Sequence, residues 1–313
     1  MMTFSSPAKL NLFLHITGQR PDGYHTVQTL FQRVDLCDTL DIEPNTTGLI
    51  TVHDEIADLE PEANLIFRAA QALKQFSHIQ QKHPTEHLGA SITLNKKIPM
   101  GGGLGGGSSN AATTLLALNK LWSLSLTQQQ LAQIGLTLGA DVPIFVNEHS
   151  AWAEGIGEIQ TPLSIKPCYY LIITPPCHAS TKHLFAHSAL NRAVKPLPCP
   201  SPHETIDPID VVSQQHNVFE PVVRSLYPEV NDTLNWLSTY GPAALTGTGS
   251  SCFIPFHNQA EADAAYQAAL KYWCSDDSLA HNLNTDHTER KTHPTEGKVK
   301  MSKYRCFLTK AIA

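Results

Sequence analysis

Hydrophobic and polar positions follow two periodicities along the first half of the chain. Alternating polar and apolar side chains predict strands, and apolar side chains three or four positions apart predict helices. Pro21-Asp22-Gly23 predicts a turn within 18–25, and Thr127 and Gly139 predict the two ends of a helix. The expected strands are 8–16, 27–36, 39–43 and 90–96, and the expected helices are 64–76, 110–122 and 127–138.

The second half shows shorter periodic segments separated by loops. Residues 195–208 are rich in proline and predict a loop, and 246–251 predict a second loop of small residues. Residues 275–302 have almost no large apolar side chains, so we expect a mobile insertion there. The expected strands are 151–157, 171–174, 252–255 and 304–311, and the expected helices are 218–225, 231–237 and 261–273.

Length and composition indicate a globular protein of two domains. At roughly 100–200 residues per domain, 313 residues fit two, and 42% hydrophobic residues supply a sizeable core. The change of pattern near 155–165 places an N-terminal domain at 1–160 and a C-terminal domain at 161–313. Twenty-two basic and 28 acidic residues give a net charge of −6, which argues against nucleic-acid and membrane-surface partners.

Targeting signals and metal-binding patterns are not evident in the sequence. No apolar run reaches the roughly 18 residues of a membrane span, and no basic region followed by an apolar stretch opens the chain. The seven cysteines are widely spaced without a C-x-x-C pair, which predicts reduced thiols and a cytoplasmic protein. Sixteen histidines show no clear ligand spacing, so we expect no metal held by the protein itself.

The most informative segment is residues 99–109, which we call the glycine loop. Six glycines in seven residues leave Leu104 as the one side chain between 101 and 107, and a strong helix follows. Backbone N–H groups of such a loop, together with the positive end of the helix dipole, form a phosphate site. No Lys of a P-loop follows the glycines, and although Gly101, Gly103 and Gly106 match the Rossmann pattern G-x-G-x-x-G, that match is weak in so glycine-dense a segment. A flexible linker is the structural alternative, disfavoured by the strand and helix on either side.

Three segments together resemble the motifs of the GHMP small-molecule kinases. They are 6–14, the glycine loop and 245–253, and residues 20–25, 139–145 and 153–158 add to the likeness in chain order. The resemblance implies an α+β fold, with an N-terminal domain like domain 2 of ribosomal protein S5 and a ferredoxin-like C-terminal domain. It implies that ATP, with Mg²⁺ carried on the nucleotide, and a small-molecule substrate meet between them.

Within that family the chain most resembles the branch that acts on a cytidyl diphosphate derivative of methylerythritol. The implied reaction moves the γ-phosphoryl group of ATP to the 2-hydroxyl of that substrate, in the non-mevalonate route to isoprenoid precursors. A monomer or a homodimer is compatible with the sequence.

The resemblance also implies the catalytic pair. Asp141 matches the family's aspartate, which would accept the proton of the substrate hydroxyl. Lys9 matches the family's lysine, which would stabilise charge on the reacting oxygen. Without the resemblance, the favoured interpretation of Asp141 is a turn cap before Pro143, and Lys9 could be a strand lysine with its amine in water.

Further site residues are implied position by position. For the cytidyl substrate they are Asn11, Tyr24, His25, Phe185, Gly247, Gly249 and Ser250. For ATP they are Asn64, Lys96, Pro99, Gly101, Gly102, Gly103, Leu104, Gly105, Gly106, Gly107, Ser108 and Ser109. In segment 216–220, Val218 stands where the family usually has an acidic residue.

Two other functions compete with this one. A related kinase for homoserine or mevalonate would need no pyrimidine site, so the Tyr24-His25 pair argues against it. A non-catalytic nucleotide- or RNA-binding module is the other alternative, because fold does not fix function. The acidic net charge argues against RNA.

Overall fold

The computed structural model describes residues 1–53, 63–81, 86–274 and 303–312. The insertion expected at 275–302 lies outside these residues. No helix in the described part of the chain is long and apolar enough to cross a membrane.

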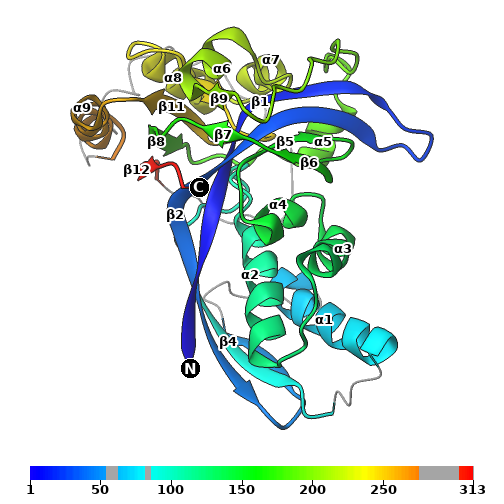
Figure 1. Ribbon diagram of the computed structural model, residues 1–313. Coiled ribbons are helices and arrows are strands. Elements are labelled where there is room, and N and C mark those ends of the chain that lie inside the picture. The colour runs from blue at the N-terminus through cyan, green and yellow to red at the C-terminus, as the bar shows by residue number, and fades with distance from the viewer. Residues whose placement is uncertain (54–62, 82–85, 275–302, 313) are drawn as a thin grey trace, which may run out of the picture.

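A long antiparallel hairpin connects the two halves of the molecule. Its strands are β1 (Met2–Gln19) and β2 (His25–Asn45), drawn in blue in Figure 1, where they run from the lower half into the upper half. The sequence predicted two strands at 27–36 and 39–43, and this was wrong. The residues between them stay in β2 because they pair with β1, Cys37 lying opposite Pro7.

The larger sheet begins in the lower half, where helices cover one of its faces, and follows the hairpin into the upper half, where β5 and β6 lie (Figure 1). The sheet order is β3 (Ile50–His53), β4 (Gly89–Asn95), β2, β5 (Ala151–Glu154) and β6 (Ile159–Pro162), with β1 on the other edge of β2. Four helices pack beside it: α1 (Leu65–Gln81), α2 (Gly106–Leu121), α3 (Gln128–Leu138) and α4 (Val142–Asn147). Their apolar side chains form one core with those of β2 and β4.

The upper half is built on a four-stranded sheet. Its order is β10 (Ala244–Leu245), β11 (Cys252–Phe256), β8 (Tyr169–Thr174) and β12 (Arg305–Lys310), all antiparallel. The helices of this half are α5 (Thr181–Ala186), α6 (Pro208–Gln214), α7 (Glu220–Leu226), α8 (Pro228–Leu237) and α9 (Gln259–Ala269), which continues as a π-helical turn (Leu270–Cys274). Strands β7 (Ser164–Ile165) and β9 (Thr205–Ile206) pair separately.

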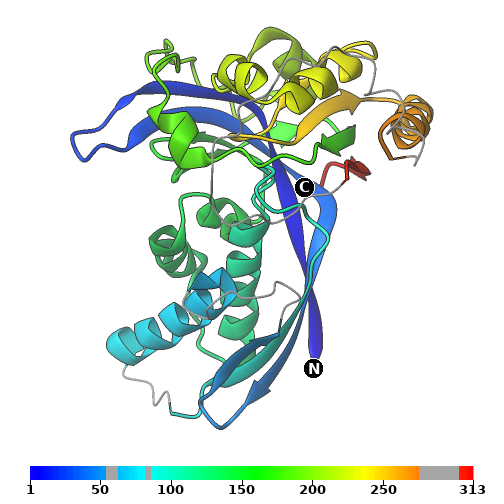
Figure 2. The same cartoon turned by 180° about the vertical axis from the view of Figure 1, so that it is seen from behind.

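Burial shows why the hairpin reaches into the upper half. Leu10 and Leu12 are buried in one cluster with Tyr170 and Phe253. Leu14 and Ile16, further along β1, belong to the core that also holds the apolar side chains of β8, α7 and α8. Figure 2 shows the same hairpin from behind, passing from one half to the other. One strand thus contributes to both halves, and the domain boundary near residue 160 stays a prediction.

Several sequence expectations differ from the structure at element ends. Helix α2 begins at Gly106, four residues before the expected 110, because its first turn is made of glycines and serines that carry no apolar signal. The expected strand 151–157 ends early, because β5 stops at Glu154 and a turn follows before β6 begins at Ile159. The helices α4, α5 and α6, of six or seven residues each, were not predicted. The capped ends of α3 at Thr127 and Gly139 are confirmed.

Acid should destabilise the fold through His15 on β1. His15 is 2% exposed, and neither ring nitrogen has a partner among the described residues. Burial, and then the nearby His216, lower the pKa of His15 from 6.5 to about 4. Between these two pH values the unfolded chain binds more protons than the folded chain. The free energy of unfolding therefore decreases as the pH is lowered from 6.5 to about 4. The expected loss is up to about 3 kcal/mol by pH 4.

Urea unfolding at several pH values between 7 and 4 measures this effect. His15→Phe removes the titrating ring and should flatten the pH dependence, whatever its packing cost at pH 7. His203→Gln, at an exposed position, is the matched control. An equally steep loss in His15→Phe and in the parent protein would contradict the assignment.

Candidate active site

The glycine loop connects β4 to α2 and is fixed by neighbours on both sides. The Lys9 N–H donates to the Leu104 carbonyl at 3.0 Å, and the Ser251 N–H donates to the Gly102 carbonyl at 3.1 Å. Beneath the helix start, Ser6 Oγ donates to Ser109 Oγ at 2.9 Å, and both residues are buried. These contacts exclude the flexible-linker alternative. Because Ser109 is buried in this hydrogen bond, Ser108 and not Ser109 lines the cavity next to the loop.

Two glycines of the loop are required by close approaches. Gly103 has φ +77°, and a Cβ there would lie 2.2 Å from the Thr246 carbonyl oxygen. Gly105 caps α2 with φ +72°, and a Cβ there would lie 2.9 Å from Phe145 and 3.1 Å from the Lys9 side chain. The loop therefore packs backbone against backbone on segment 246–251 and leaves room for Lys9.

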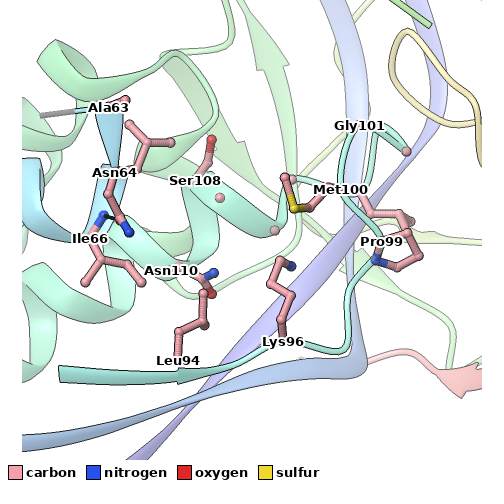
Figure 3. A pocket seen from close by; sticks show the side chains of 17 residues that line it. Ala63, Asn64, Ile66, Leu94, Lys96, Pro99, Met100, Gly101, Ser108 and Asn110 are labelled. Carbon is pink, nitrogen blue, oxygen red and sulfur yellow. Dashed lines mark hydrogen bonds between the residues drawn. The ribbon is translucent and has the colours of Figure 1, made fainter. Parts of the chain in front are cut away.

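The loop forms a wall shared by two cavities. Gly101, Gly103 and Gly105 line both of them. The first cavity, shown in Figure 3, lies between the starts of α1 and α2. It is lined by Ala63, Asn64, Leu65, Ile66, Leu94, Lys96, Pro99, Met100, Gly101, Gly102, Gly103, Leu104, Gly105, Gly106, Gly107, Ser108 and Asn110. Every residue that the sequence analysis assigned to ATP, except Ser109, lines this first cavity.

A buried carboxylate holds the amine of Lys96 under the loop. Lys96 Nζ donates at 2.6 Å to Asp38 Oδ2 and at 2.6 Å to the Ile98 carbonyl. Asp38 is fully buried and also accepts from the N–H groups of Lys97 and Ile98. Burial lowers the pKa of Lys96, while Asp38 opposes that shift. Lys96 is thus a partly buried amine that Asp38 and the Ile98 carbonyl hold at the cavity wall.

Asn110 was not identified from the sequence. It is 3% exposed and lines the first cavity, and its Nδ2 donates to Asp38 at 3.1 Å. Its Oδ1 is buried without a partner among the described residues. Figure 3 shows Asn64, just before α1, Lys96, just after β4, and Asn110, in α2, around the same space. The signal that was missed is a polar side chain in the first turns of an Ala/Leu-rich helix.

The second cavity holds the Lys9–Asp141 ion pair. Lys9 Nζ lies 3.4 Å from Asp141 Oδ2, and the two side chains are 3% and 37% exposed. Lys9 is therefore not a strand lysine with its amine in water. Asp141 precedes α4 but makes no capping hydrogen bond, so its carboxylate remains available to the cavity. The turn-cap alternative for Asp141 is not supported.

Asn11 orients the amine of Lys9. Lys9 Nζ donates to Asn11 Oδ1 at 2.5 Å, and Asn11 Nδ2 donates to Thr29 Oγ1 at 3.0 Å. The Asn11 N–H donates to Thr246 Oγ1 at 3.0 Å. Asn11 and Thr29 both line the second cavity. Thr29 was not identified from the sequence, because a threonine in a strand carries no signal of its own.

The predicted base-binding residues are only partly together. The rings of His25 and Phe185 stack with centroids 5.1 Å apart, and Phe185 lines the second cavity. His25 Nε2 is buried without a partner among the described residues, and burial, followed by Arg192, lowers the pKa of His25. Tyr24 is 62% exposed on the turn and lines neither cavity.

The loop at 246–251 closes the second cavity from the upper half. Gly247 and Gly249, two of the residues assigned to the substrate, line it. Ser250 does not: it is buried and donates to the Cys177 carbonyl at 3.0 Å. Asn217 holds this loop, since its Nδ2 donates to the carbonyls of Leu245 and Gly247 at 2.9 and 2.8 Å.

Val218, beside Asn217, is buried and carries no polar side chain to the site. His178, Thr181 and Thr248 also line the second cavity and were not identified from the sequence. They lie on short loops and on the short helix α5, whose periodicity is too weak to place them in advance.

Comparison with known proteins identifies the family. Residues 64–149 match the N-terminal domain of GHMP kinases, and residues 203–274 match their C-terminal domain. A curated protein of Nitrosococcus oceani, named 4-diphosphocytidyl-2-C-methyl-D-erythritol kinase, is 46% identical over 273 residues, which is 87% of this chain and 92% of that one. The chain belongs to the GHMP kinase family. The resemblance seen in the sequence is confirmed.

Other relatives agree with this placement among GHMP kinases. A protein of the same name from Aliivibrio salmonicida is 48% identical over 263 residues, 83% of this chain and 85% of that one. A crystal structure of 4-(cytidine 5'-diphospho)-2C-methyl-D-erythritol kinase superposes with a TM-score of 0.69 at 29% identity, over 87% of this chain and 96% of that one. The Methanococcus jannaschii mevalonate kinase, at 15% identity, covers 100% and 98% with a TM-score of 0.64 and shares the fold alone.

Gly103→Ala should damage the site of this GHMP kinase without unfolding it. The new Cβ meets the Thr246 carbonyl in a left-handed backbone, which costs on the order of 1–3 kcal/mol and displaces the loop. ATP binding, measured by calorimetry, should weaken by about tenfold or more. Gly18→Ala is the matched control, since its Cβ would meet only the Thr26 hydroxyl at 3.1 Å. Unchanged ATP affinity in folded Gly103→Ala would contradict the role of this contact.

Proposed function

We propose that the chain catalyses ATP-dependent phosphorylation of the 2-hydroxyl of 4-diphosphocytidyl-2-C-methyl-D-erythritol, giving the 2-phosphate and ADP. The observation that carries the proposal is that the glycine loop forms a wall shared by two cavities. We assign the first cavity to the nucleotide, and the second holds the Lys9–Asp141 pair. Phosphoryl transfer requires a donor phosphate and an acceptor hydroxyl on either side of one anion site. Relatives at 46–48% identity carry the name of this kinase.

The first cavity fits ATP. Leu65, Ile66 and Leu94 offer apolar surface to a purine ring, and the unpartnered Asn110 Oδ1 is an acceptor for an exocyclic amine. The N-terminus of α2 and the N–H groups of the glycine loop then receive the phosphates. The described residues include no group of three or more metal-ligand side chains. We infer that the Mg²⁺ that neutralises phosphate charge arrives on the nucleotide.

Asp141 is the proposed general base. Its carboxylate reaches the second cavity and makes no competing cap, so it can accept the proton of the acceptor hydroxyl as that oxygen attacks phosphorus. Lys9, buried and 3.4 Å away, orients the carboxylate and stabilises negative charge on the attacking oxygen. Asn11 keeps that amine directed into the cavity by accepting its hydrogen bond.

The His25–Phe185 stack is the proposed cytidine site. Phe185 lies at the cavity, and its ring is stacked on His25, whose buried Nε2 has no protein partner among the described residues. Because the pKa of His25 is lowered, the imidazole is neutral at pH 7 and can bond the edge of a pyrimidine. A homoserine or mevalonate site would have no use for this pair. We further propose a cytoplasmic location, which the seven free thiols support.

A substrate panel tests the proposal. Purified protein with Mg-ATP is offered the cytidyl compound, homoserine, mevalonate or no acceptor, and ADP release is followed. We expect turnover with the cytidyl compound alone. Turnover with mevalonate or homoserine alone would reject the cytidine site, and ATP binding without turnover of any acceptor would favour the binding-module alternative.

Asp141→Asn should retain ATP binding and lose turnover. The amide fills the same space but cannot accept the proton, so kcat should fall by roughly 10²–10⁴. Steady-state kinetics with calorimetry of ATP separates the two effects. Asp210→Asn, a surface carboxylate on α6 outside both cavities, is the control and should keep full activity. An unchanged kcat in Asp141→Asn would remove this residue as the base.

A further inference from the structure

Two thiols that take no part in the proposed reaction lie next to each other in the upper half. Cys274 ends the π-helical turn after α9, and Cys306 lies in β12. Their sulfur atoms are 3.5 Å apart although the residues are 32 positions apart in the chain. A disulfide needs a sulfur–sulfur distance of about 2.05 Å, so the two atoms have to approach by about 1.5 Å.

Independent contacts hold the two cysteines as neighbours. The rings of Trp273 and Tyr304 stack with centroids 4.4 Å apart at an interplanar angle of 29°. The Cys274 thiol also contacts the Tyr304 carbonyl at 3.5 Å. On the other side, β12 pairs with β8, which puts Cys306 opposite Ile173. The thiols are thus held together by the surrounding fold and do not depend on each other for their positions.

We propose that Cys274 and Cys306 form a redox site whose reactant is a small disulfide of the glutathione type. The Cys274 thiolate attacks one sulfur of the oxidant, and a mixed disulfide forms as one glutathione leaves as a thiolate. Cys306 loses its proton to that thiolate and attacks the Cys274 sulfur, which expels the second glutathione. The two cysteines lose two electrons and two protons in total, and the oxidant is reduced to two thiols.

The environment of each thiol supports this order of attack. Burial, and then Cys274, raise the pKa of Cys306 far above its ordinary value, so Cys306 is a poor first nucleophile. Cys274 is half-buried at the end of a helical segment, and Cys306 is half-buried in β12. Once the mixed disulfide exists, Cys306 attacks it from within contact distance, and proximity offsets its low thiolate fraction.

The bond would fix the edge strand of the upper sheet. β12 is held by its pairing with β8, by Arg305 donating to the Lys97 carbonyl at 3.0 Å, and by the Lys310 N–H donating to Asp35 at 2.9 Å. A covalent link from β12 to the end of α9 restricts the unfolded chain and therefore stabilises the fold. We expect the melting temperature to rise by about 3–6 °C on oxidation.

Peptide mapping of the full chain tests the site directly. The protein is incubated with excess glutathione disulfide, the remaining thiols are alkylated, and tryptic digestion is followed by mass spectrometry without reduction. We expect peptides 272–290 and 306–310 to be found as one linked species, and dithiothreitol to separate them. A glutathione adduct that persists on Cys274, with no linked species, would overturn the proposal.

Serine variants give the second readout. Cys274→Ser and Cys306→Ser should each abolish the rise in melting temperature, while Cys199→Ser, at an exposed position, should preserve it. Peptide mapping uses the unsubstituted chain, so its result does not depend on whether a serine variant folds. A rise that survives in both Cys274→Ser and Cys306→Ser would assign the stabilisation to other cysteines and reject this pair.

Discussion

The site depends on the backbone of β1, which bonds in turn to three segments far away in the chain. The Lys9 N–H donates to the Leu104 carbonyl of the glycine loop, and the Asn11 N–H donates to Thr246 Oγ1. Further along, the Leu14 N–H donates to the His216 carbonyl. Because a strand is stiff and advances about 3.3 Å per residue, these bonds fix the relative positions of all three segments.

The same strand explains how a buried amine is tolerated in the second cavity. Removing a charged amine from water costs several kcal/mol unless it is paired and hydrogen-bonded. Lys9 is 3% exposed, and Asn11 Oδ1 and Asp141 Oδ2 lie around its amine. Asn11 is in turn held by Thr29 from β2. The amine is therefore oriented before any substrate arrives, which is the condition under which charge stabilisation is most effective.

The sequence identified the residues of this site that lie in local motifs better than the residues that line it from elsewhere in the chain. Motifs such as the glycine loop are local, because their residue types reflect what the backbone must do there. His178 and Asn217 reach the site through tertiary packing, which periodicity does not report. Ser250 and Ser109 show the opposite error: each stands within a recognisable motif, yet its side chain is buried in a structural hydrogen bond. The continuous β2 was missed for a similar reason, since its middle is kept in place by pairing with β1.

The glycine loop also depends on the upper half of the molecule. Ser251 is bonded through its N–H to the Gly102 carbonyl and through its hydroxyl to Thr174, the last residue of β8. A displacement of β8 would therefore be transmitted to the loop by two consecutive hydrogen bonds. Since β12 pairs with the edge of β8 that lies opposite β11, the position of β12 bears on the geometry of the glycine loop, which lies almost 200 positions earlier in the chain. The contact between the halves is consequently part of the site itself, and neither half presents the complete arrangement alone.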